Sequence, residues 1–94
     1  MKKGKKKIKT HTFNGNKYDI EIDNNLGGFC ESPKCANSNP TLSILTDLST
    51  RKGLEHAIHE SLHACNYMKD EDTVEQVAYD IGRFLWRIGY RINN

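Results

Sequence analysis

Hydrophobic and polar residues alternate along residues 17–23, where an aromatic or aliphatic residue occupies every second position. A period of two is typical of a β-strand with one buried and one solvated face. The preceding Asn14-Gly15 tolerates the positive φ angles of a tight hairpin turn, so residues 8–13 are predicted to form the partner strand. Two further strands are predicted, at Phe29–Cys30 and, behind Pro40, at Thr41–Thr46.

The period changes to about 3.6 residues at Thr50, which predicts a helix reaching residue 68. Its apolar positions and its histidines fall on different sides of the helix. A polar break at residues 69–72 separates it from a second helix, predicted from Thr73 to Tyr90. The predicted buried stripe of this second helix comprises Val74, Val77, Ala78, Ile81, Phe84, Leu85 and Ile88.

Strands followed by helices indicate an α+β fold, in which two helices pack on one face of a small, mostly antiparallel sheet. The chain has 94 residues and no internal repeat, so residues 10–94 are expected to form a single domain. Residues 1–9 are expected to form a flexible basic arm in front of it.

The positive charge of the chain is concentrated in this arm. The formal net charge is +2, and removing the six lysines of the arm leaves 2 − 6 = −4 for residues 10–94. Such an arm can contact nucleic acid through phosphates, or it can be a solvated tail without a dedicated partner. The lysines concerned are Lys2, Lys3, Lys5, Lys6, Lys7 and Lys9.

The sequence predicts a cytoplasmic protein. No stretch is long and apolar enough to span a bilayer, and no apolar segment follows the N-terminal lysines as in a signal peptide. Cys30, Cys35 and Cys65 are an odd number of cysteines, which argues against a disulfide framework. Free thiols are expected, with a local disulfide or a zinc knuckle at Cys30 and Cys35 as the alternatives.

Candidate chemistry lies in His59-Glu60-Ser61-Leu62-His63, an H-E-x-x-H motif. Residues four apart stack on one side of a helix, so His59 and His63 can bind one zinc ion. Glu60 lies at the edge of that side, where it can take a proton from a zinc-bound water. The alternative is a helix whose histidines merely face solvent.

A catalytic zinc needs a third protein ligand. Glu75 is expected to supply it from the second helix, although Asp72-x-x-Glu75 also fits a capping box. Asp80 is the next candidate. His56 and Tyr67 share the histidine side of the first helix and are candidate substrate-binding residues, with an exposed histidine and a packing tyrosine as the alternatives.

Residues 54–64, followed by Val74-Glu75-Gln76-Val77-Ala78-Tyr79-Asp80, resemble the zincin metallopeptidases of the gluzincin type. The likeness is greatest to minimal forms, namely ImmA/IrrE-like, SprT-like and small phage-encoded zincins. It implies His59, His63 and Glu75 as ligands and Glu60 as the general base. It also implies that Thr41–Thr46 is an edge strand that binds the substrate, through Ser43 and Ile44.

The function expected from motif and resemblance is hydrolysis of a peptide bond in a protein or peptide substrate by Glu-activated, zinc-bound water, with one zinc ion as cofactor. The alternative is a non-catalytic zinc-binding module, associated with nucleic acid through the lysine arm.

Overall fold

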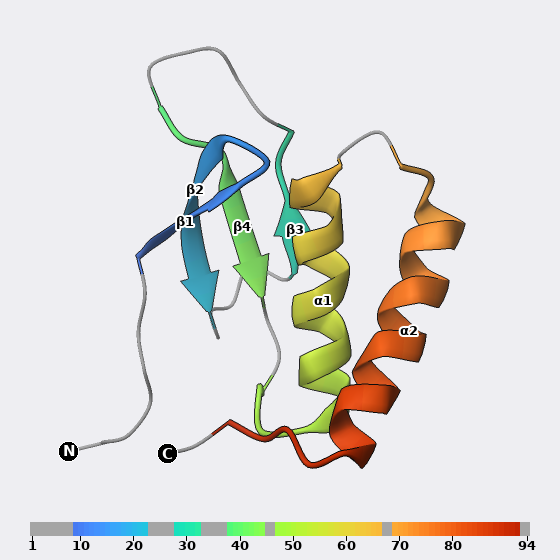
Figure 1. The fold of residues 1–94 in the computed structure, drawn as a ribbon. Helices are drawn as coiled ribbons and strands as arrows, with labels where there is room; N and C mark the ends of the chain where they lie inside the picture. Colours follow the sequence, from blue (N-terminus) through green and yellow to red (C-terminus); the bar gives the residue numbers. More distant parts are fainter. Residues whose placement is uncertain (1–8, 23–27, 33–37, 45–46, 67–68, 93–94) are drawn as a thin grey trace, which may run out of the picture.

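The strands and helices of the chain follow the expected order, with the sheet first and the helices after it (Figure 1). The structure is a computed structural model, and it describes residues 9–22, 28–32, 38–44, 47–66 and 69–92. The elements are β1 (Thr10–Phe13), β2 (Asn16–Ile22), β3 (Phe29–Cys30), β4 (Thr41–Ile44), α1 (Arg51–Cys65) and α2 (Glu71–Arg87). The α+β prediction is confirmed.

The sheet has four strands in the order β1-β2-β4-β3. β1 and β2 form the predicted antiparallel hairpin around Asn14 and Gly15, whose φ angles are 48° and 82°. β4 lies parallel to β2 and antiparallel to β3, so the sheet is mixed. β4 is therefore an interior strand. The expectation that Thr41–Thr46 forms a sheet edge is wrong, because the strand is paired on both sides (residues 45–46 lie outside the described residues).

The core lies between the sheet and one side of α1. Tyr18, Leu42 and Ile44 contribute large side chains from β2 and β4, and Ala64 contributes a small one from α1. The buried positions of α1 itself are Gly53, Glu60 and Ala64. Ala64 lets the helix approach the sheet closely, and Glu60 places an acidic side chain in that interface. Gly53 instead packs against the backbone of Asp47 and Leu48.

Only α1 contacts the sheet among the described elements, and α2 packs on the far side of α1 (Figure 1). The buried residues of α2 are Val74, Ala78 and Gly82, which follow one another at intervals of four. A Cβ atom added to Gly82 would lie 2.5 Å from Cγ of Glu55, so the glycine allows close contact between the helices. This arrangement brings the start of α2 beside the end of α1.

The buried stripe of α2 is narrower than predicted. Ile81, Phe84 and Ile88 are 40 %, 60 % and 56 % exposed, whereas Val74 and Ala78 are fully or almost fully buried. The sequence pattern could not separate these groups, because α2 carries apolar residues over more of its circumference than α1 covers.

Candidate metal centre

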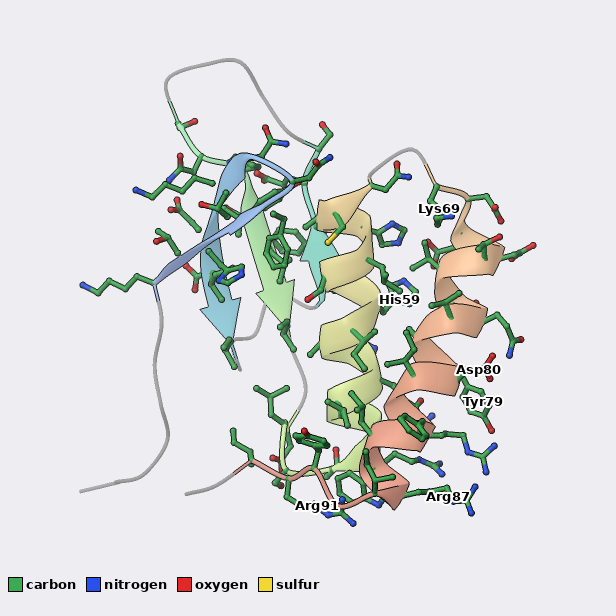
Figure 2. All side chains as sticks on the ribbon, viewed as in Figure 1. His59, Lys69, Tyr79, Asp80, Arg87 and Arg91 are labelled. Carbon is green, nitrogen blue, oxygen red and sulfur yellow. The ribbon has the colours of Figure 1, made fainter. Side chains whose placement is uncertain are left out.

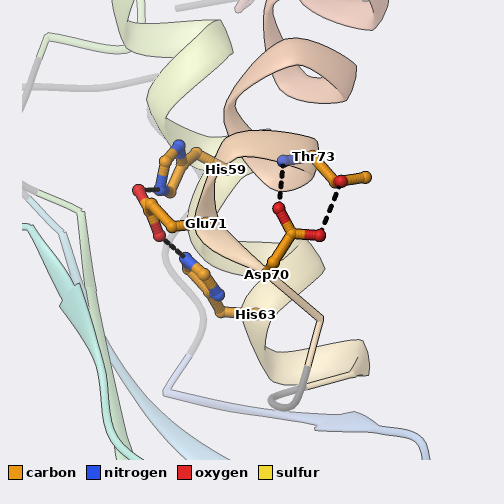
Figure 3. A network of polar contacts seen from close by, with 5 residues as sticks. All are labelled: His59, His63, Asp70, Glu71 and Thr73. Atoms are coloured by element: carbon orange, nitrogen blue, oxygen red, sulfur yellow. Dashed lines mark hydrogen bonds and ion pairs between the residues drawn. The ribbon is translucent and has the colours of Figure 1, made fainter.

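Two histidines of α1 point toward the first turn of α2 (Figure 3). His59 and His63 are four residues apart, and their ring centroids are separated by 4.9 Å. Both side chains are partly buried, with 22 % and 16 % of their surface exposed. The helix thus holds two imidazoles on one side, as the motif predicts.

Glu71 is the residue that connects the two imidazoles. Its carboxylate oxygens lie 3.1 Å from Nε2 of His59 and 2.8 Å from Nε2 of His63 (Figure 3). One ligand atom from each of the three residues falls within 4.8 Å of the others. The group could therefore hold a metal ion.

The donor set fits zinc. Two imidazole nitrogens and one carboxylate oxygen form a known catalytic zinc set, which leaves a fourth position open. Tetrahedral zinc with bonds of about 2.0–2.2 Å needs ligand atoms about 3.3–3.6 Å apart. The observed N···O distances are 2.8 and 3.1 Å, each to a different oxygen of the Glu71 carboxylate.

The structure places Glu71, and not Glu75, beside the histidines, so the predicted third ligand does not lie with them. The reason is where α2 begins. Asp70 is its N-cap, and the Asp70 carboxylate accepts a hydrogen bond from the backbone N–H of Thr73 at 3.0 Å. The Thr73 hydroxyl also donates to this carboxylate, at 2.7 Å. The hydroxyl bond and the backbone bond together hold the pKa of Asp70 below its ordinary value. The helix therefore starts two residues earlier than predicted, with Glu71 in its first turn.

Glu75 is exposed one helical turn farther along α2, outside the cluster. The Asp72-x-x-Glu75 capping box is likewise replaced by the Asp70 cap. Asp80 lies nine residues beyond Glu71, a distance of about 13 Å along a helix, and accepts a hydrogen bond from Gln76. Neither Glu75 nor Asp80 joins the histidines.

Glu60 lies between α1 and the sheet, and only 7 % of its surface is exposed. Burial raises the pKa of its carboxyl above the ordinary 4.5, and the neighbouring histidines oppose that change. A Cβ atom on Gly28 would lie 3.6 Å from Oε2 of Glu60, so the glycine before β3 lies beside this carboxylate. Glu60 therefore sits deeper than its predicted place at the edge of the histidine side.

These groups surround an open cavity of about 370 Å³. It extends from the end of α1 to β3 and the start of α2, and its polar lining matches a site for charged or hydrogen-bonding groups. The lining residues are Cys30, His59, Glu60, His63, Lys69 and Glu71.

Sequence reasoning missed Lys69 and Cys30 as lining residues. Lys69 is exposed just before the Asp70 cap, where it adds a positive charge to the lining. Cys30 is partly buried, and burial raises the pKa of its thiol to about 11. Cys30 and Cys65 are free thiols, as expected, and Cys35 lies outside the described residues. No local sequence signal connects Cys30 to the motif, because only the sheet order brings β3 beside α1.

The predicted substrate-binding residues do not gather at the cavity. Ser43 and Ile44 are 0 % and 6 % exposed within the interior strand β4, so their side chains cannot reach a substrate. His56 stacks on His59 with ring centroids 6.5 Å apart, and its Nδ1 is buried without a hydrogen-bond partner. A Cβ atom on Gly28 would lie only 3.2 Å from that nitrogen, so His56 packs behind the site. Tyr67 lies outside the described residues.

The basic arm is largely outside the described residues. Lys9 is exposed in front of β1, whereas Lys2, Lys3, Lys5, Lys6 and Lys7 lie outside them. Binding of nucleic acid by the arm stays a prediction.

Neither described helix has the length and apolarity that a membrane span requires. No protein-family model matches the chain, and no curated protein or solved structure shows significant similarity to it.

Proposed function

We propose that the protein is a zinc-dependent metallopeptidase, in which His59, His63 and Glu71 hold one zinc ion and Glu60 acts as the general base. The observation that supports it is the convergence of these three side chains on one point, with a buried carboxylate lining the same cavity. Bound zinc would supply Lewis-acid activation of water and of a peptide carbonyl.

Glu60 is suited to accept a proton. It follows His59 directly on α1, so its carboxylate lies beside the histidine cluster without joining it. In the chain without a metal ion, burial raises the pKa of this carboxyl above its ordinary value, which favours proton uptake. The same carboxyl group can then return that proton to the amine that leaves.

β3, rather than β4, is proposed to bind the substrate. β3 is the sheet edge next to α1. Its pairing with β4 decides which of its backbone groups point toward the open side. The Glu31 N–H donates to the Thr41 carbonyl at 2.9 Å. Alternate residues of an antiparallel strand face opposite edges, so the N–H and C=O of Cys30 point away from β4. An extended peptide can pair with this edge beside Glu60.

The test is peptide hydrolysis by the zinc-loaded full chain, with a digest of denatured proteins as the substrate mixture. Mass spectrometry measures the cleavage products, which are compared with those formed by Glu60→Gln. We expect Glu60→Gln to keep its zinc and to lose hydrolysis by about 10²–10⁴-fold. Glu75→Gln is the matched control, because it makes the same chemical change at an exposed residue outside the cavity lining, and it should keep both zinc and hydrolysis.

Two outcomes would count against the proposal. Equal hydrolysis by Glu60→Gln and wild type would remove Glu60 from the reaction. Stoichiometric zinc with no hydrolysis in either protein would favour the alternative, a zinc-binding module without catalytic activity.

A further inference from the structure

The C-terminal half of α2 carries an apolar stripe that the described part of the chain leaves uncovered. Ile81, Phe84 and Ile88 are 40 %, 60 % and 56 % exposed, and Val77 extends the stripe toward the start of the helix. The intervals along this stripe are four, three and four residues. Alternating intervals of three and four form the seam of a coiled coil.

The stripe is distinct from the face that packs on α1. The buried face follows Val74, Ala78 and Gly82 at intervals of four. At about 100° per residue, the centre of the uncovered stripe lies roughly a quarter turn away from it. A partner on the stripe would therefore lie beside α1 without displacing it.

Two opposite charges flank this seam on the same side. Asp80 and Arg87 are seven residues apart, and both lie on the outer side of α2 (Figure 2). In heptad terms they occupy two successive g positions, with Ile81 and Ile88 at a and Val77 and Phe84 at d. Asp80 accepts a hydrogen bond from Gln76 through one carboxylate oxygen. Both charged residues are exposed.

This order of charges is self-complementary when two α2 helices run antiparallel. Each a residue then faces a d residue, so Ile81 meets Phe84 of the partner subunit and Val77 meets Ile88 of the partner subunit. The same alignment sets Asp80 opposite Arg87 of the partner subunit, and the two-fold symmetry repeats the ion pair. In a parallel pair each g residue would face an e position instead, and Asp80 would meet an apolar side chain, Leu85 of the partner subunit.

We propose that two copies of the chain associate through this stripe, with their α2 helices antiparallel. The apolar seam supplies the attraction, and the paired Asp80 and Arg87 set the orientation. One helix pair of this length buries less than the roughly 1,200 Å² at the lower end of stable interfaces. The dimer is accordingly weak, with a Kd on the order of 1–100 μM.

The dimer does not depend on the metal centre. The middle of the seam lies about eleven residues beyond Glu71, which is about 17 Å along the helix axis. Failure of the peptidase proposal would leave the dimer untouched, and the reverse holds as well.

Charge exchange tests the proposal on the folded full chain, by sedimentation velocity from about 1 μM to 1 mM. Wild type should shift from monomer to dimer over this range. Asp80→Arg and Arg87→Asp, each alone, should weaken association at least tenfold, because they oppose like charges. An equimolar mixture of the two variants should recover a heterodimer, and the double exchange should recover the homodimer.

Arg83→Asp is the matched control, since it makes the same change of charge on α2 away from the seam. It should associate as wild type does. Phe84→Asp, checked for native helical content by circular dichroism, should be monomeric throughout. A wild type that stays monomeric up to about 1 mM, or single exchanges that associate as wild type does, would overturn the proposal.

Discussion

The two ends of the α1–α2 pair contrast in chemistry. At one end, His59, His63 and Glu71 bring polar groups to a single point beside a polar cavity. At the other end, Phe84 and Ile88 expose more than half of their surface. The first end concentrates groups that a cation can satisfy, and the second carries apolar surface that the described residues leave exposed. The two proposals therefore concern opposite ends of one helical hairpin, in which Gly82 allows close contact between the helices.

Removing either histidine should abolish zinc binding at the polar end. His59→Ala and His63→Ala leave two protein ligands, so zinc bound per chain should fall from about one to near zero at micromolar free zinc. Metal content after gel filtration measures this. His11→Ala, which alters an exposed histidine of β1, is the control. Full zinc content in His59→Ala would place the metal elsewhere.

Glu71→Gln and Glu75→Gln test which carboxylate of α2 binds the zinc ion. Glu71→Gln should weaken zinc binding by more than the about 10–100-fold that loss of an outer partner of a ligand causes. Glu75→Gln should bind as wild type does, because Glu75 lies outside the cluster. Competition with a chromophoric chelator measures both affinities. The opposite ranking would restore Glu75 as the ligand.

Zinc should stabilise the fold, because its ligands join two helices. At free zinc of about 100 times the Kd, binding adds about 2.7 kcal/mol to the free energy of unfolding. For a chain of this size that corresponds to a rise in Tm of about 10–20 °C. Differential scanning fluorimetry with zinc or with EDTA measures it. An identical Tm in both conditions would show that the ion does not link the helices.

The two faces of α2 should differ in their cost of truncation. Val74 is 0 % exposed, so Val74→Ala should lower the free energy of unfolding by about 1–3 kcal/mol. Phe84→Ala removes a larger but mostly exposed side chain and should change the stability of the monomer by less than about 0.5 kcal/mol. Urea denaturation at low micromolar concentration gives both values. A large loss for Phe84→Ala would mean that the chain covers this side chain.

The smallest expected effect concerns the Asp70 cap. Hydrogen bonds from Thr73 lower the pKa of the Asp70 carboxyl below 3.8, so the ionised carboxylate stabilises the folded state above pH 3.8. This stabilisation is lost as the pH falls through the lowered pKa of the folded state. In the presence of chelator, Asp70→Ala should be less stable than wild type at pH 7, and the difference should shrink as the pH falls through the lowered pKa of Asp70. Thermal unfolding across this range tests it, and a difference that grows toward low pH would contradict it.

Local sequence patterns predicted much of the fold. The alternation around Tyr18, the Asn14-Gly15 turn and the helical spacing of His59 and His63 predicted the hairpin and α1, because each depends on residues close in sequence. Strand order depends on distant contacts, so the interior place of β4 and the approach of β3 to α1 could not be read from periodicity.

The third ligand shows the same limit at smaller scale. Asp70 and Asp72 are both competent helix caps, and choosing between them moves the helix start by two residues. Because the helix is capped at Asp70, Glu71 lies in its first turn. The sequence alone offers no energetic reason to prefer Asp70 as the cap, since the contacts of Glu71 are made with histidines of α1 across the turn.

The most direct test is a crystal structure of the full chain grown with zinc, with anomalous diffraction recorded at the zinc edge. We expect one strong anomalous peak bonded to Nε2 of His59, Nε2 of His63 and the carboxylate of Glu71, with Glu60 close by and not bonded. A zinc-soaked crystal without that peak, or with the peak on other side chains, would contradict the metal centre and the function proposed from it.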